Sequence, residues 1–133
     1  MSAYTHKNLK TDVEDMAPGF GMSPQVEARF AREALDCEKG GVSYERLAPD
    51  TRMPFGHSHK QQEEIYVVVS GGGRVKLDDE IRDVSQWDAI RVEGSTMRAF
   101  EAGPDGLEVI AFGAPNTGPG DGDIVPGWWA EGD

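Results

Sequence analysis

The pattern of hydrophobic and polar positions changes period once along the chain, near residue 41. Through residues 24–37, apolar side chains recur at helical spacing, at Val26, Phe30 and Ala34. A serine and a proline are typical of a helix start, and the two glycines that follow this segment are typical of a helix end. We therefore predict one short amphipathic helix over residues 24–37, preceded by an extended arm of residues 1–22.

From residue 42 the period becomes two, in short runs separated by turn residues. The runs are VSYERL (42–47), EIYVVVS (64–70), RVKLD (74–78), EIRDVS (80–85), DAIRV (88–92), MRAFEA (97–102) and LEVIAF (107–112). Several short strands at such spacing predict an all-β sandwich or barrel. We expect this barrel, with its leading helix, to span residues 23–112. The Pro- and Gly-rich residues 113–133 form a tail, and Trp128 and Trp129 indicate that part of it packs on the protein.

The strongest strand, residues 64–69, is apolar on one whole face. Alternation places Glu64, Tyr66 and Val68 on one side and Ile65, Val67 and Val69 on the other. The second face should not meet water. We expect the helix of residues 24–37, the tail or a partner subunit to cover it, and we predict a homodimer.

Composition and charge narrow the class of protein. The chain has 133 residues, which suits one domain. Its net charge of −11 argues against nucleic acid or an anionic membrane as a partner. The single cysteine excludes a disulfide framework within the chain and a cysteine-rich zinc site. Neither a membrane-spanning apolar run nor a signal peptide is evident, so we expect a cytoplasmic protein.

Two histidines and a glutamate form the main candidate site. His57 and His59 are two residues apart, so on a strand both imidazoles point to the same side. Glu64 follows at the head of the strongest strand. Imidazole and carboxylate ligands from adjacent strands can converge on a transition metal. A pair of histidines at this spacing is also common on surfaces and in cores, so the spacing alone predicts little.

The segment HSHKQQEEIYVVVSG resembles the first signature of the cupin family, G-x5-H-x-H-x3/4-E-x6-G. His57, His59, Glu64 and Gly71 stand at the family's spacing, and Thr51 replaces the leading glycine. The resemblance covers about residues 42–112. It implies a cupin-type double-stranded β-helix, or jelly-roll barrel. It also implies a divalent transition metal (Fe, Mn, Ni, Zn or Cu), which cupins normally hold with three histidines and the glutamate.

The second cupin signature keeps its length but not its residues. Counting from Trp87-Asp88 places Arg98 where the family has its third histidine, whereas a register counted from Gly94 places Met97 there. With Arg98 inward, Phe100 also faces inward and Glu101 faces out. We favour this register because it buries an aromatic ring and leaves a carboxylate in water.

Arginine stays protonated and cannot donate a lone pair to a metal. Three interpretations therefore remain open. His57, His59 and Glu64 hold a metal by themselves; or an Arg98–Glu64 ion pair replaces the metal; or the register is wrong and another residue completes the site. Around this centre we predict that four side chains line the ligand pocket: Arg98, Tyr66, Phe100 and Gln62.

These observations favour a small-molecule-binding protein with a degenerate metal site, whose ligand is a small and possibly anionic molecule. The alternative is a metal-dependent cupin enzyme of the dioxygenase or isomerase type, which uses the two histidines and the glutamate. The sequence shows no second free carboxylate or histidine for acid–base work, and it identifies no catalytic residue.

Overall fold

The computed structural model describes residues 3–118, 120–130 and 132, and almost all regular structure in them is β-strand. One 3-10 turn, η1, spans Pro18–Phe20. The strands are β1 (Val26–Phe30), β2 (Gly41–Leu47), β3 (Phe55–His59), β4 (Glu63–Leu77), β5 (Glu80–Ser85), β6 (Ala89–Val92), β7 (Arg98–Ala114) and β8 (Gly122–Pro126). The predicted all-β class is confirmed.

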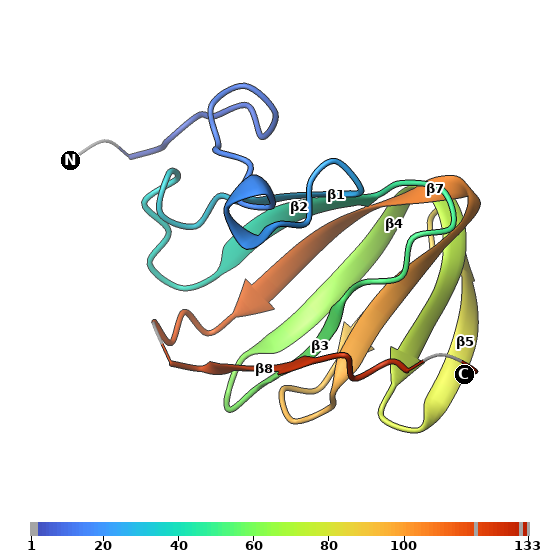
Figure 1. The fold of residues 1–133 in the computed structure, drawn as a ribbon. Coiled ribbons are helices and arrows are strands. Elements are labelled where there is room, and N and C mark those ends of the chain that lie inside the picture. Colours follow the sequence, from blue (N-terminus) through green and yellow to red (C-terminus); the bar gives the residue numbers. More distant parts are fainter. Residues whose placement is uncertain (1–2, 119, 131, 133) are drawn as a thin grey trace.

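The strands form one curled sheet, open on one side like a half-barrel (Figure 1). The long strands β4 and β7 run through its middle and pair from Glu63↔Ala114 to Leu77↔Arg98. β2 and β1 extend the sheet beyond one half of β7, while β3 and β8 extend it beyond the other. β5 and β6 pair with the two halves of β4. Four of the predicted runs therefore merge into two continuous bent strands.

The bend in β4 depends on two glycines. The register with β7 shifts between Val68 and Ser70, and again between Gly71 and Gly73. Gly71 has a φ of +72°, and a Cβ there would lie 2.0 Å from the carbonyl oxygen of Gly106. A Cβ on Gly73 would lie 2.0 Å from the carbonyl oxygen of Glu101. Glycine thus allows the two backbones to approach closely while the sheet curls.

The predicted helix over residues 24–37 is wrong. Residues 26–30 form β1, which pairs with β2 from Val26↔Leu47 to Phe30↔Ser43, and residues 32–36 form turns. When β1 pairs with β2, the backbone N–H and C=O groups along the free edge of β2 gain hydrogen-bond partners. The stability gained from this pairing outweighs the local preference of residues 24–37 for a helix. The strand also places Glu27 directly across from Arg46, which binds its carboxylate at 3.1 Å.

The N-terminal segment packs on the outer side of β1 and β2. Val13 is buried there, whereas Ala17, further along the segment, belongs to the core cluster together with Val26. Lys10 Nζ lies 2.8 Å from Glu27 Oε2 and sits over the ring of Tyr44. Arg29 binds the same carboxylate at 2.6 Å. These contacts bury Tyr44 on the outer face of the sheet.

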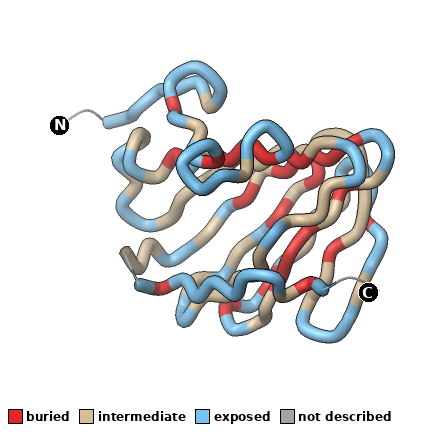
Figure 2. The backbone as a smooth tube through the Cα atoms, viewed as in Figure 1, coloured by how far each residue is buried: buried red, intermediate tan, exposed pale blue. Residues whose placement is uncertain are grey.

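The core fills the concave side of the sheet, where buried residues cluster along β4 and β7 (Figure 2). Tyr66 and Val68 lie there. The opposite face is only partly covered. Ile65 is 41% exposed beside its cross-strand neighbour Phe112, which is 47% exposed. The expected helix cannot cover this face because it does not form, and the homodimer stays a prediction.

None of the helical structure in the described residues has the length and apolar character needed to cross a membrane.

Candidate metal centre

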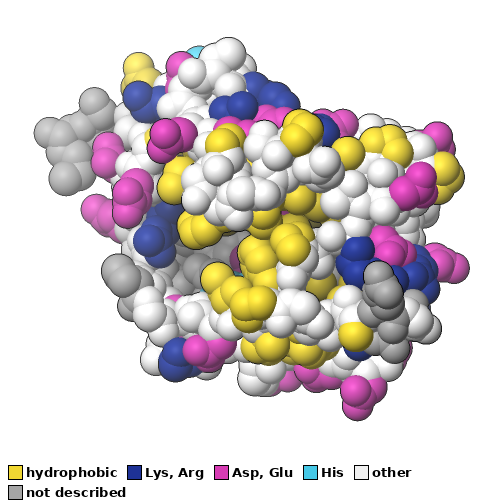
Figure 3. Space-filling model, in the orientation of Figure 1, with side chains coloured by type: hydrophobic (Ala, Val, Ile, Leu, Met, Phe, Trp, Pro, Cys, Tyr) yellow, Lys and Arg dark blue, Asp and Glu magenta, His cyan; other side chains and the backbone are white. Residues whose placement is uncertain are grey.

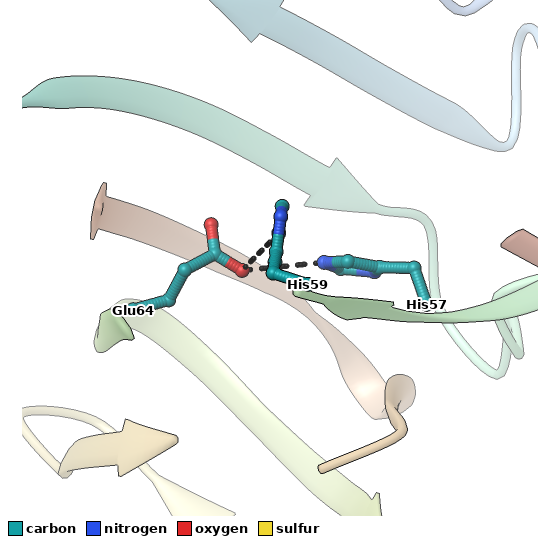
Figure 4. A group of neighbouring side chains, drawn as sticks. All are labelled: His57, His59 and Glu64. Atoms are coloured by element: carbon teal, nitrogen blue, oxygen red, sulfur yellow. Dashed lines mark hydrogen bonds and ion pairs between the residues drawn. The ribbon is translucent and has the colours of Figure 1, made fainter. Parts of the chain in front are cut away.

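His57, His59 and Glu64 converge from two strands, as Figure 4 shows. Both histidines lie on β3, and Glu64 lies at the start of β4. Glu64 Oε1 is 3.2 Å from His57 Nε2 and also 3.2 Å from His59 Nε2. One ligand atom from each of the three lies within 4.8 Å of the others. Both imidazoles therefore point to one side of β3, as their spacing predicts.

The C-terminal segment holds His59 in place. His59 Nδ1 is 3.0 Å from Asp121 Oδ2, and Asp121 is buried. The backbone N–H groups of Gln61 and Gln62 also donate to Asp121, and together these hydrogen bonds outweigh its desolvation and lower its pKa. A carboxylate at Nδ1 favours the tautomer that leaves Nε2 free to bind a metal.

Glu64 is held as an anion. Burial alone would raise its pKa, but hydrogen bonds from His57, His59 and the Tyr66 hydroxyl bring the pKa far below its ordinary value. The Tyr66 hydroxyl donates to Glu64 Oε1 at 2.6 Å. The hydrogen bond to Glu64 in turn raises the pKa of His59. A metal ion must then displace a proton from His59, which makes metal binding weaker at acidic pH.

Arg98 does not replace a metal. Its side chain is completely buried, and its guanidinium donates to the carbonyl oxygens of His57 at 3.4 Å and Glu93 at 3.3 Å. Its Nε is buried without a hydrogen-bond partner. No ion pair joins Arg98 to Glu64 in the described structure, so the interpretation in which such a pair replaces the metal is not supported.

The other predicted pocket residues occupy different positions. Phe100 is buried and meets the Tyr66 ring edge-on, with centroids 5.1 Å apart. Gln62 turns toward the tail instead, where its Nε2 donates to the carbonyl oxygen of Pro115 at 3.3 Å. Contacts of these side chains with a ligand remain predictions.

Sequence reasoning missed two acidic residues near this centre. Asp121 lies 62 positions from His59, inside a Pro- and Gly-rich segment with no motif around it. Glu45 lies on β2 and faces the concave side with the core, because its cross-strand neighbour is the buried Val109. The only sequence feature that could have pointed to Glu45 is its place in the alternating run VSYERL.

The three donor groups fit a divalent transition metal. Two neutral imidazole nitrogens and one carboxylate oxygen on one side of an ion form a ligand set known for first-row metals, with the remaining positions open. Figure 3 shows that the molecule is recessed on the open side of the curled sheet, above β8 in this view.

Comparison with known proteins supports the fold. No protein-family model and no curated protein matches the chain. Solved structures do match. A cupin protein from Bacteroides fragilis is 24% identical with a TM-score of 0.70, covering 88% of each chain. KdgF from Halomonas sp. is 20% identical with a TM-score of 0.66, covering 86% of this chain and 94% of KdgF.

The nucleoside dehydratase Pac13 from Streptomyces is 16% identical with a TM-score of 0.71, and the match covers 92% of each chain. These likenesses extend over most of this chain and most of each neighbour. Together with the curled sheet built on β4 and β7, they show that the chain has the cupin fold.

Proposed function

We propose that the protein binds a divalent transition metal through His57, His59 and Glu64, and that the metal holds a small oxygen-containing ligand in the barrel. The observation that carries this proposal is the convergence of two Nε2 atoms on Glu64 Oε1, each at 3.2 Å. An anionic carboxylate between two imidazoles is arranged to receive a cation. A bound metal would supply positive charge and open positions for ligand oxygens.

The surroundings of the three residues support this proposal. Asp121 orients His59 so that its Nε2 faces Glu64. The cationic Arg98 points to backbone carbonyls and leaves the carboxylate of Glu64 unpaired by arginine. Tyr66 donates to the same carboxylate and fixes its orientation. These contacts hold the ligand atoms in place before a metal arrives.

The second candidate is a metal-dependent enzyme of the dioxygenase or isomerase type. Neighbours of the same fold include a nucleoside dehydratase and oxalate decarboxylase, so this architecture supports catalysis in other chains. The observation in this chain that favours an enzyme is the carboxylate of Glu45 on the concave face, which could serve in proton transfer. The fold alone does not choose between binding and catalysis.

Water-proton relaxation in the presence of Mn(II) tests the proposal. If Mn(II) binds with open positions, its exchanging waters should enhance relaxation, and acetate should reduce this enhancement by displacing them. Glu64→Gln should abolish the enhancement, whereas His6→Ala, which removes an exposed histidine of the N-terminal segment, should leave it unchanged. Equal signals from the wild-type protein and Glu64→Gln would refute the proposal.

A further inference from the structure

Glu45 is an acidic side chain on the concave face of the sheet. Its neighbours across the two adjacent strands are Ala28 on β1 and Val109 on β7, and both are buried. Glu45 itself is half-buried. Its carboxyl group therefore shares the side of the sheet that carries the core and Glu64.

The carboxyl group of Glu45 has no partner. Within the described residues, no hydrogen bond or ion pair reaches it. The other carboxylates that are not exposed all accept at least one hydrogen bond: Asp15, Glu27, Glu64, Asp88, Glu101, Glu108 and Asp121. In the described part of the chain, the fully buried side-chain polar atoms without a partner are Arg98 Nε and Trp129 Nε1, so the oxygens of half-buried Glu45 keep contact with solvent. A carboxyl group that no protein donor holds is free to exchange a proton with a small molecule.

Among the strands that face Glu45 in the described structure, only β4 presents a charged side chain. β1 presents Val26, Ala28 and Phe30 on this side, and β7 presents Leu107, Val109 and Ala111, all of them apolar. β4 presents Glu64 and Tyr66. Burial raises the pKa of Tyr66, and the charges of Glu64 and Glu45 raise it further. Glu45 is therefore close enough to sense the centre electrostatically, but it lies outside the three-residue ligand group.

These surroundings make Glu45 easy to protonate. Burial, and secondarily the charge of Glu64, raise its pKa from 4.5 to about 7. A metal ion would offset the charge of Glu64, but it would not remove the burial. A carboxyl group that titrates near neutral pH can both give and take a proton, as general acids and bases must.

We propose that Glu45 is the acid–base group of the barrel and exchanges a proton with a ligand held at the His57, His59 and Glu64 centre. This inference rests on the proposed function, because the centre must first hold the ligand. The ligand class is a small carboxylate or carbonyl compound whose oxygen can accept a proton.

The proton balance is simple. Protonated Glu45 breaks its O–H bond and keeps the bonding pair as carboxylate, while a lone pair of the ligand oxygen forms the new O–H bond. The reverse step returns the proton. When an anion binds without reacting, Glu45 takes a proton from solvent instead, since two adjacent negative charges are unfavourable in a desolvated site.

Calorimetry with the full-length protein, loaded with Mn(II) and titrated with acetate, tests this. Measurements at pH 8 in two buffers of different ionisation enthalpy count the protons taken up. We expect uptake of about one proton per acetate in the wild-type protein and almost none in Glu45→Gln. Glu108→Gln is the matched control: it changes the same side chain on β7, on the outer face, and should keep the uptake.

Each outcome decides between the claims. Failure of Mn(II) to bind overturns the proposed function. Mn(II) binding without acetate binding contradicts the ligand part of the proposed function, and the role of Glu45 falls with it. Acetate binding with proton uptake that persists in Glu45→Gln overturns the role of Glu45 alone. A metal-free measurement adds an independent check. Because the raised pKa destabilises the folded state as pH rises from about 4.5 to 7, Glu45→Gln should have a higher Tm than the wild-type protein at pH 8 and an equal Tm at pH 4. A lower Tm at pH 8 would show that Glu45 has a stabilising partner and would overturn the proposal.

Discussion

Asp121 and His59 are joined across 62 positions of sequence, with Asp121 Oδ2 3.0 Å from His59 Nδ1. This contact makes the C-terminal segment part of the candidate metal centre. The segment is held there by β8, which pairs with β3 from Phe55↔Pro126 to His59↔Gly122. Asp121, the carboxylate partner of His59, directly precedes β8, and β8 pairs with the strand that carries both histidines.

Removing the charge of Asp121 should weaken metal binding. In Asp121→Asn the side chain can no longer favour the Nδ1–H tautomer of His59 as strongly, so Nε2 is less available. We expect metal affinity to fall about 10- to 100-fold, the usual cost of losing such a partner. Competition with a fluorescent chelator measures it. Asp123→Asn, which alters an exposed carboxylate on β8, serves as the control; equal affinities for the two variants would contradict this role for Asp121.

A histidine at position 98 should strengthen the centre. Arg98 is the cross-strand neighbour of His57, so both side chains leave the sheet on the same side. Arg98→His would then offer a fourth ligand, and we expect metal affinity to rise about tenfold, or about 1.4 kcal/mol. Met97→His is the matched comparison. If Met97→His raises the affinity and Arg98→His does not, the register that places Arg98 at the fourth-ligand position is wrong.

Glu27 should stabilise the fold in a pH-dependent way. Burial opposes its ionisation, but Lys10, Arg29 and Arg46 together lower its pKa from 4.5 to about 2. The folded state therefore gains stability above pH 4.5 and loses it as pH falls from about 5 toward 2.

Glu27→Gln should cost about 2 kcal/mol of unfolding free energy at pH 7, less than for a fully buried pair because Lys10 and Arg46 are partly exposed. Urea unfolding at pH 7 and pH 3 measures the cost, which should shrink at pH 3. Glu38→Gln, at an exposed position, should change little at either pH. A cost for Glu27→Gln that is the same at both pH values would rule out this account.

The alternation of apolar and polar residues predicted most strands of the sheet, but it failed where contacts between distant segments determine the structure. The alternating runs between residues 42 and 112 are strands because period two survives burial of one face. Residues 26–30 alternate over too short a span to outweigh a helical pattern, and only pairing with β2 makes them a strand. β8 lies in the Pro- and Gly-rich tail and has no alternating pattern of buried and exposed residues, so its pairing with β3 could not be read from the sequence.

The candidate site likewise contains some residues that the sequence predicts and others that it does not. His57, His59 and Glu64 are close in sequence, so their spacing carried the prediction. Asp121 is distant and carries no motif. Glu45 could not be predicted for a different reason. In VSYERL, the alternation suggests that Val42 and Tyr44 face the core. In the structure, Tyr44 is buried on the outer side beneath Lys10, and Glu45 faces the core.

The most direct test of the central claim is elemental analysis by ICP-MS of the untagged protein, purified without chelators, beside the His57→Ala/His59→Ala double variant. A polyhistidine tag would bring its own metal and must be absent. The three-ligand centre predicts about one equivalent of a single transition metal, lost in the double variant. No bound metal in the wild-type protein, even after incubation with Fe(II), Mn(II), Ni(II) or Zn(II), would contradict it.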